Sequence, residues 1–410
     1  MSVYKILFTP LEEYFFGDEG SFTSKIEESK YFLISKDIPT QTTVFGLIRY
    51  MGLKHVKSDF DYTFLEKKEN EENIGKYAFD MEKAAENCFE NTYGKIKRMS
   101  SVFIHENNGG ISRIYVSLPK DASNEMEEHE ENKKQVDDGK NYTSILKGKL
   151  STIKTGNGDK LLPENFDHKK GILNGYISID GGYCYKNKEI RKENSNGNKI
   201  LTEVFKNIKK SNIRIYSEEE RRKLKIEEDD KMSSLFKREY KNFSNSLEGK
   251  FSFGVFLETD FEDDFVRKNF NRIIGMGLGN KKFKVTAEKT GEIEKKARLN
   301  EDFTLKVDKI FKNHPQKYKL IYFISPAYIK DSNKIIEDSL FSSISTTTNR
   351  PQKRKKDNTI SKIKELYRMI DAGSIILVKD SKKFLKEIDN SAMKKIGYNH
   401  FYIGGKKNEC

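Results

Sequence analysis

The sequence predicts an α+β protein built from two open antiparallel sheets, each with helices on one face. Three observations support this prediction. The chain has 410 residues, which corresponds to two or three domains of ordinary size. Short apolar runs with the alternation of β-strands occur in both halves, and helical apolar spacing occurs between them. A dense run of mixed charges at 217–230 suggests a boundary between about 200 and 250.

The N-terminal segment predicts two strands and a helix. Val3 to Phe8 forms an apolar run that stops at Thr9-Pro10, and a second strand is expected at Tyr31 to Ser35. Four apolar residues then recur at i, i+3, i+4 and i+7, namely Val44, Leu47, Ile48 and Met51. This spacing predicts a threonine-capped helix from about Thr42 to Leu53.

The C-terminal half predicts a similar mixture of elements. Alternation from Phe251 to Leu257 indicates a strand, and Phe261, Phe265 and Ile273 fit a helical run that ends at Gly275. A basic strand is expected next. The remaining expected elements are strand Lys281 to Val285, strand Leu320 to Ser325, helix Ser361 to Ile370, strand Gly373 to Val378, a helix near Phe384 to Ile388 and a strand near His400 to Ile403.

The net charge of +13 favours a polyanionic partner such as nucleic acid or an anionic membrane surface, although a solvated basic surface explains it equally well. The charge is uneven along the chain. The acidic segment 121–138 has eight Asp or Glu against two Lys and reads as a mobile loop. The segment 342–358 reads as a disordered basic loop. Its cations are Arg350, Lys353, Arg354, Lys355 and Lys356.

The cysteines and apolar runs point to a cytoplasmic protein. The three cysteines lie far apart without CxxC spacing, so neither a disulfide framework nor a cysteine-based zinc site is indicated. We expect no secretory signal, because the first apolar run is interrupted by Lys5 and stopped by Pro10. The longest uncharged apolar stretch, Leu320 to Ile329, is about half a membrane span, so no membrane partner is expected.

Catalytic motifs give little support for an enzyme. The six histidines are scattered without HExxH spacing, and neither a GxSxG elbow nor a P-loop occurs. The adjacent carboxylates Glu262, Asp263 and Asp264 could bind a metal, but they fit better as an exposed helix start. We therefore predict no cofactor and no metal site.

Two segments could bind phosphate. Gly275, Gly277 and Gly279 are too closely spaced for a dinucleotide fingerprint, but their N–H groups could approach phosphates, with charge added by the residues that follow. A plain tight turn is the alternative. The helix start at Thr40 to Thr43 offers free N–H groups and hydroxyls, or it is an ordinary threonine cap. The residues of interest after the glycines are Asn280, Lys281, Lys282 and Lys284.

Five segments, in order along the chain, resemble one family. They are Phe8 to Asp18 (FTPLEEYFFGD), Ile38 to Arg49 (IPTQTTVFGLIR), Leu118 to Ala122 (LPKDA), Ile321 to Ala327 (IYFISPA) and Ala372 to Ile375 (AGSI). Together they are similar to the RAMP proteins that form the third Cmr subunit of type III-B CRISPR effector complexes. Gly17 departs from the pattern, because the family usually has arginine there.

The resemblance implies two ferredoxin-like (RRM-like) domains, here 1–240 and 241–410. It also implies a noncatalytic subunit that binds the 5′ handle of the crRNA, docks on the large polymerase-cyclase subunit and contacts the adjacent RAMP backbone subunit. The RNA-binding residues that it implies are Thr40, Gln41, Thr42, Thr43, Arg49, Gly277, Gly279, Asn280, Lys281 and Lys282. To these RNA-binding candidates we add Arg350, Lys353 and Arg354 of the basic loop 342–358.

Two alternatives stay open at this point. A RAMP-type endoribonuclease that processes CRISPR repeat RNA would need a general acid and base near a 2′-OH, and His55 is the candidate residue. A generic basic scaffold outside CRISPR systems would require the five motif matches to be coincidental.

Overall fold

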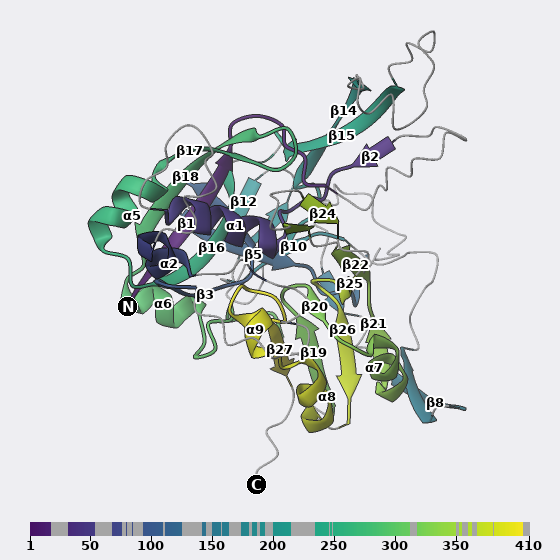
Figure 1. Cartoon of the computed structure of the whole chain (residues 1–410). Coiled ribbons are helices and arrows are strands. Elements are labelled where there is room, and N and C mark those ends of the chain that lie inside the picture. The colour runs from purple at the N-terminus through teal and green to yellow at the C-terminus, as the bar shows by residue number, and fades with distance from the viewer. Residues whose placement is uncertain are drawn as a thin grey trace.

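The computed structural model is strand-rich and mixed α/β, with sheets that are antiparallel apart from one parallel pairing (Figure 1). This confirms the predicted class in its coarse form. The structure describes residues 1–17, 32–53, 68–75, 79, 84, 93–109, 111–124, 142–144, 150–156, 158–163, 174–179, 183–186, 189–192, 200–214, 234–245, 247, 249–311, 318–349, 352–354, 360–362, 367–379 and 381–404.

A nine-stranded antiparallel sheet forms the centre of the molecule. Its strands follow the order β13, β10, β5, β4, β16, β1, β18 and β17, and β3 also pairs with β16. Their bounds are β1 Ser2–Pro10, β3 Ile96–Met99, β4 Phe103–Asn108, β5 Ile111–Ser117, β10 Tyr176–Ser178, β13 Ile200–Leu201, β16 Lys250–Thr259, β17 Arg272–Met276 and β18 Lys281–Lys289. The predicted domain boundary at 240 thus separates strands that share this sheet.

Three smaller sheets and four hairpins complete the strands. The C-terminal sheet has β21 Phe341–Ser343, β26 Ile375–Val378, β19 Lys319–Phe323 and β27 Phe401–Gly404. Another joins β20 Ala327–Tyr328, β25 Tyr367–Ile370 and β22 Thr346–Asn349, and a third joins β14 Phe205–Arg214, β15 Ser234–Phe243 and β2 Phe32–Ile34. The separate hairpins are β6 Ala122–Asn124 with β7 Tyr142–Ser144, β8 Leu150–Thr155 with β9 Gly158–Pro163, β11 Tyr183–Lys186 with β12 Glu189–Lys192, and β23 Gln352–Arg354 with β24 Ile360–Lys362.

The helices are short and lie on the outer faces of the sheets (Figure 1). They are α1 Gln41–Met51, α2 Lys68–Ile74, α5 Asp263–Phe270, α6 Glu292–Arg298, α7 Ser332–Asp338, α8 Ser381–Ile388 and α9 Ser391–Lys394. Among the helices of the described ranges, none is long and apolar enough to span a bilayer.

Strand β1 shows how the central sheet is buried on both faces. Tyr4, Ile6 and Phe8 join a core cluster that includes residues of α1 and α5, whereas Val3 and Leu7 face the opposite way. Because successive side chains of a strand point to opposite faces, the helices cover one face and another layer must cover the other. That layer is the C-terminal sheet.

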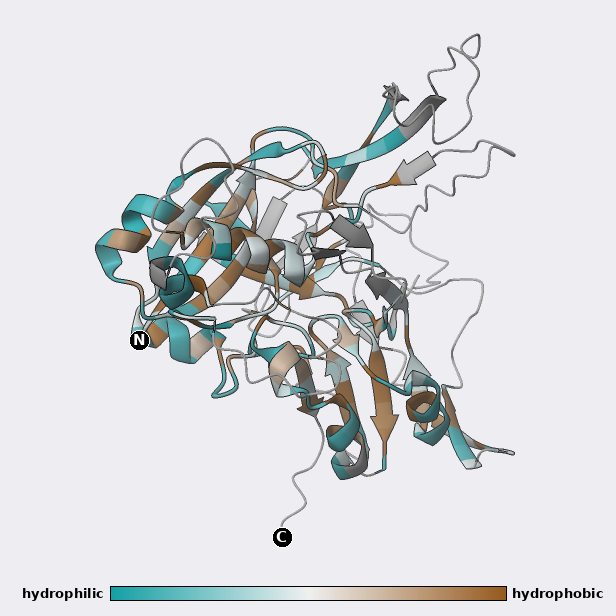
Figure 2. Cartoon of the chain, viewed as in Figure 1, coloured by the Kyte–Doolittle hydropathy of each residue, from teal (hydrophilic) through white to brown (hydrophobic). Residues whose placement is uncertain are grey.

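The C-terminal sheet is likewise buried on both faces. Leu320 and Tyr322 of β19 pack with the central sheet, whereas Ile321 and Phe323 pack with residues of α7 and α8. The order of layers is therefore helices, central sheet, C-terminal sheet and helices. Figure 2 shows the strands of the C-terminal sheet in brown, as hydrophobic residues, and the projecting β14–β15 hairpin mostly in teal.

Several predicted elements agree with the structure. Strand β1, helix α1, strand β18, strand β19 and helix α8 occupy the segments where the sequence predicts them. The carboxylates Glu262 to Asp264 form the start of α5, with Glu262 at its N-cap position. Within the described part of the chain, no group of three or more His, Cys, Asp or Glu is placed to hold a metal ion.

Three predictions of secondary structure are wrong. The predicted helix at 361–370 is instead strands β24 and β25, and Ile273 lies in strand β17 because α5 ends at Phe270. The predicted disordered loop at 342–358 contains β21, β22 and β23. Met369 and Ile370 show the cause: these neighbours point to opposite faces of an interior strand and are both 1% exposed, so buried strand residues do not alternate strictly and their spacing can also fit a helix.

Candidate nucleic-acid interface

Helix α1 begins with a threonine cap. Thr40 has extended backbone angles, and its Oγ1 accepts a hydrogen bond from the N–H of Thr43 at 3.3 Å. Thr40 Oγ1 also lies 2.9 Å from the hydroxyl of Thr43 and 3.1 Å from that of Thr42. The first helical N–H groups, those of Gln41 and Thr42, precede any possible intrahelical partner. The predicted cap is therefore present, and it still leaves donors for an anion.

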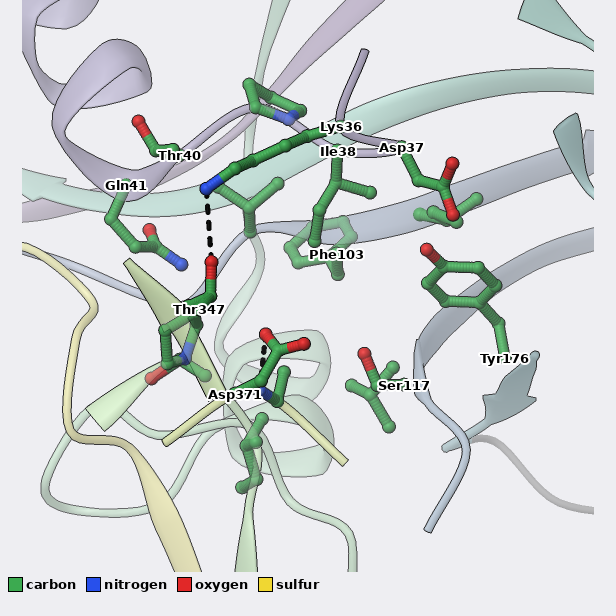
Figure 3. Close-up of a pocket in the computed structure, with 18 of the residues that line it drawn as sticks. Lys36, Asp37, Ile38, Thr40, Gln41, Phe103, Ser117, Tyr176, Thr347 and Asp371 are labelled. Atoms are coloured by element: carbon green, nitrogen blue, oxygen red, sulfur yellow. Dashed lines mark hydrogen bonds between the residues drawn. The ribbon is translucent and has the colours of Figure 1, made fainter. Parts of the chain in front are cut away.

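A cavity of about 620 Å³ opens beside this helix start (Figure 3). Thr40 and Gln41 line it, so the structure brings two of the predicted site residues to one pocket. The walls come from segments far apart in the sequence, including Phe103 on β4, Tyr176 on β10 and Asp371 after β25. No local sequence pattern identifies these partners, because they come from segments far apart in the sequence.

Charged groups surround the mouth of the cavity. The ammonium of Lys36 donates to Thr347 Oγ1 at 3.1 Å, which links the two halves of the chain across the pocket (Figure 3). Lys241 Nζ lies 3.2 Å from a carboxylate oxygen of Asp37. Burial, together with the nearby Asp37 and Asp371 carboxylates, raises the pKa of Tyr176 well above its ordinary value. The phenol is therefore a neutral hydroxyl at physiological pH.

The guanidinium of Arg49 is bound to backbone carbonyls of the protein. Its Nε donates to the carbonyl of Ile74 at 3.1 Å and its Nη2 to that of Gly75 at 3.3 Å. Burial lowers the pKa of this guanidinium, which nevertheless stays charged at neutral pH. Arg49 therefore ties α1 to the end of α2, and a contact between Arg49 and RNA stays a prediction.

The glycine segment is the turn between β17 and β18. Gly277 and Gly279 have φ values of 77° and 80°, and Asn280 has 51°, all in the left-handed region. The N–H of Leu278 donates to the carbonyl of Phe15 at 2.9 Å. The tight-turn alternative is thus present in the structure, and one N–H of the turn is already occupied by protein.

Replacing Gly277 with alanine should destabilise the protein more than the same change at Gly279. Both residues have positive φ, which costs an alanine roughly 1–2 kcal/mol. A Cβ on Gly277 would in addition lie 2.6 Å from the carbonyl oxygen of Phe15, whereas one on Gly279 meets no atom within 4 Å. Urea unfolding of the two variants measures the difference. Equal losses would show that the approach to Phe15 relaxes freely.

Lys281 is neutralised by two carboxylates at the end of β1. Its Nζ lies 3.1 Å from Glu12 and 3.3 Å from Glu13, and the N–H of Lys282 donates to Glu12 at 2.9 Å. Lys210 of β14 also pairs with Glu13, and the hydrogen bond from Lys210 lowers the pKa of Glu13 to about 2. These two carboxylates therefore lie beside Lys281 and Lys210, in the positions that a phosphate would occupy to contact the same cations.

The β14–β15 hairpin carries cations along one face, which sequence reasoning missed. Cross-strand pairing places Lys206 opposite Asn242, Ile208 opposite Tyr240 and Lys210 opposite Arg238. Because directly opposed residues share a face, Lys206, Lys210 and Arg238 lie on the same side as Tyr240. We call Lys206, Lys210, Arg238 and Lys281 the basic face.

Aromatic rings form the floor of the basic face. The ammonium groups of Lys281 and Lys210 lie 5.3 Å and 5.6 Å from the ring centre of Tyr240, within cation–π range. Arg238 lies 5.7 Å from the ring centre of Phe15. The sequence signal that could have found this face is the charge of the two strands. Strand β14 has four Lys or Arg and β15 has three, against one Glu in the pair.

One short segment joins the cavity and the glycine turn. The carbonyl of Phe15 accepts from Leu278 of the turn, and the N–H of the next residue, Phe16, donates to Ser35 Oγ at 2.9 Å. Ser35 lines the cavity. The structure therefore places the two predicted phosphate sites on either side of Phe15–Phe16, although they are more than 200 residues apart in the sequence.

The remaining predicted residues lie in strand β23 or outside the described part of the chain. Lys353 and Arg354 belong to strand β23, of which the structure describes the backbone pairing alone. Arg350 and the alternative catalytic residue His55 lie outside the described residues, as does most of the acidic segment 121–138. Contacts of these residues with RNA remain predictions.

Comparisons with known proteins identify one family. The model of a family described as "CRISPR-associated protein (Cas_Cmr3)" matches residues 6–406. No curated protein matches the chain. Solved structures with some likeness include a chain of a type III-B Cmr-beta complex bound to cognate target RNA and AMPPnP, at 13% identity and a TM-score of 0.43, over 96% of this chain and 94% of that one. A chain of the same type of complex bound to cognate target RNA has 14% identity and a TM-score of 0.43, over 97% and 96%.

Proposed function

The chain belongs to the Cas_Cmr3 family of CRISPR-associated proteins, and on that premise we propose that it is a noncatalytic RNA-binding subunit of a type III-B Cmr effector complex. It binds the 5′ handle of the crRNA, docks on the large polymerase-cyclase subunit and contacts the adjacent RAMP backbone subunit. Two ferredoxin-like domains, 1–240 and 241–410, belong to the same proposal.

The basic face is the main observation that supports the proposed binding of RNA. It gathers cations from β14, β15 and β18 on one surface next to the glycine turn, held over the buried rings of Tyr240 and Phe15. A surface with several cations suits single-stranded RNA, because the cations can follow the phosphates of its backbone. The helix start at Thr40 lies beyond Phe15–Phe16 and extends the surface toward the cavity.

Binding of labelled RNA to the purified chain tests the proposal. We expect tighter binding to a crRNA that carries its 5′ handle than to one with the handle scrambled, and a decline in affinity as salt rises. The same measurement is repeated with the large subunit present, since the handle would lie between the two proteins. Equal affinity for both RNAs in both settings would contradict the assignment to the handle.

Replacing Glu12 and Glu13 together with glutamine should strengthen RNA binding. The two carboxylates pair with Lys281 and Lys210, and neutralising them removes negative charge that competes with phosphate for these cations. Each restored phosphate contact is worth about fivefold in affinity at 0.1 M salt for a single strand. Filter binding at 0.1 M salt measures the gain. Unchanged or weaker binding would mean that the ion pairs serve only to hold the hairpin in place.

A further inference from the structure

Strand β17 forms one edge of the central sheet, at the margin away from the C-terminal sheet (Figure 1). It pairs with β18 on one side, and no strand of the described ranges pairs with its other side. Sheets usually protect such an edge with proline, a bulge or charged side chains, because unpaired N–H and C=O groups attract another strand. Strand β17 has no proline, its ladder has no register shift, and its side chain Ile273 is 62% exposed.

The backbone groups of Ile273 point outward from this edge. The N–H of Leu11 donates to the carbonyl of Lys282 at 3.0 Å, so Lys282 turns its backbone groups toward β1. Successive residues of an antiparallel strand alternate in this direction, so Phe283 turns its groups toward its partner Ile274 in β17. By the same alternation, Ile273 turns its N–H and C=O away from β18. The edge therefore offers the hydrogen-bonding groups that an added strand needs.

The face of the sheet at this edge combines an aliphatic side chain with two cations. Ile273 lies opposite Lys284, and Lys282 lies two residues away from Lys284 on the same face. Both lysines are exposed, and neither ammonium forms an ion pair or a hydrogen bond with another residue of the described ranges. Beside Lys282 lies Leu11, which is 52% exposed. A segment that fits this face needs an aliphatic side chain for Ile273 and carboxylates for the lysines.

These properties favour a protein segment over a nucleic acid. Single strands are held by cations together with rings that stack on the bases, and the aromatic side chains of β1 and β18 are all buried. The free N–H and C=O of Ile273 match the backbone of a second polypeptide. The basic face is a different surface, because Lys281 and Lys282 are neighbours in β18 and point to opposite faces of the sheet.

We propose that β17 binds an extended acidic segment of a partner protein as an added antiparallel strand. An aliphatic residue of that segment lies opposite Ile273 and exchanges hydrogen bonds with its N–H and C=O. Acidic residues two positions to either side point to the same face, where they meet the positive charge of Lys284 and Lys282. The site does not depend on the proposed binding of RNA, so either can fail without the other.

A fluorescein-labelled peptide of sequence TETVTET, added to the full chain at 0.1 M salt, tests the proposal by fluorescence anisotropy. Its valine and two glutamates share one face when the peptide is extended. Ile273→Asp should weaken binding about tenfold through loss of the aliphatic contact, and Lys284→Glu about fivefold through loss of an exposed ion pair. The matched control is Ile293→Asp on α6, where the side chain is 88% exposed, and it should bind as the wild type does. The basic peptide TKTVTKT should bind more weakly than TETVTET.

Methylation of single peptide nitrogens separates strand addition from a contact of side chains alone. A methyl group on the valine nitrogen removes the N–H that would face β17, whereas one on the preceding threonine removes an N–H that would face away. We expect the first to abolish binding and the second to preserve it. Equal affinity of the two methylated peptides would overturn the added strand.

Hydrogen exchange measured by mass spectrometry locates the bound peptide. TETVTET should slow exchange of the Ile273 amide, and hexauridine should not. If hexauridine protects this amide and the peptide does not, the edge belongs to a nucleic acid and the proposal is overturned. The same conclusion follows if TETVTET fails to bind at millimolar concentration. The RNA assay described above decides the proposed function separately.

Discussion

Replacing Glu106 with glutamine is expected to lower the free energy of unfolding by about 3–5 kcal/mol. Glu106 and Arg113 face each other across β4 and β5, and their side chains are 0% and 2% exposed. The guanidinium Nη1 lies 3.1 Å from Glu106 Oε2, which also accepts from the hydroxyl of Tyr115 at 2.5 Å. Removing the carboxylate charge takes this counter-ion away from the buried guanidinium, and charge buried without compensation is the costly part of breaking such a pair.

Urea denaturation followed by circular dichroism measures this loss. The matched control is Asp260→Asn, because Asp260 forms an ion pair of similar length, 2.9 Å to Lys97, with both side chains more than a third exposed. Exposed pairs contribute little, so the control should unfold almost like the wild type. A double variant, Glu106→Leu with Arg113→Met, should recover part of the loss because no unpaired charge remains. Equal losses at Glu106 and Asp260 would contradict the argument.

Local patterns were sufficient for the elements whose partners lie nearby in sequence or whose ends carry strong signals. Helix α1 follows from the spacing of Val44, Ile48 and Met51 and from the Thr40 cap, both of which the structure contains. The glycine turn follows from residues that tolerate positive φ. The five motifs also led to the correct family, as the match over residues 6–406 confirms.

Other features depend on pairing between distant segments, which one sequence does not reveal. Strand β25 has helical apolar spacing, but it pairs with β22, where Thr347 opposes Met369. Strand β22 lies in the segment 342–358 that was predicted to be a disordered basic loop, although its β-branched threonines suit a strand once a partner strand is present. Tertiary pairing overrides local preference in both cases.

The candidate site likewise combines residues that a local motif predicts with residues that only the fold brings together. Thr40 and Gln41 could be predicted from the family motif, but the cavity beside them needs Phe103, Tyr176 and Asp371 from three other segments. The basic face is not evident from the sequence, because the charged segment 217–230 between β14 and β15 has the composition of a linker. The sequence could nominate Lys281 as an RNA-binding candidate. Its pairing with Glu12 and Glu13 becomes visible only in the folded structure.

The double variant Lys206→Glu with Lys282→Glu should weaken RNA binding by at least about 25-fold at 0.1 M salt. Both lysines are exposed, and each phosphate contact contributes about fivefold for a single strand at this salt concentration, so two lost contacts multiply to this value. Lys206 extends the basic face along β14, and Lys282 follows Lys281 at the glycine turn. The loss should be larger still when the new carboxylates repel the phosphates.

Salt dependence separates a phosphate contact from a general loss of fold. The slope of log K against log salt should become less steep by about 1.4 in the double variant, because two fewer counterions are released at about 0.7 each. Lys268→Glu is the control, since Lys268 is exposed on α5, far from the β14–β15 hairpin (Figure 1). It should bind RNA almost as the wild type does. If Lys268→Glu weakens binding as much as the double variant with a similar change of slope, the RNA senses net charge alone and neither Lys206 nor Lys282 contacts it.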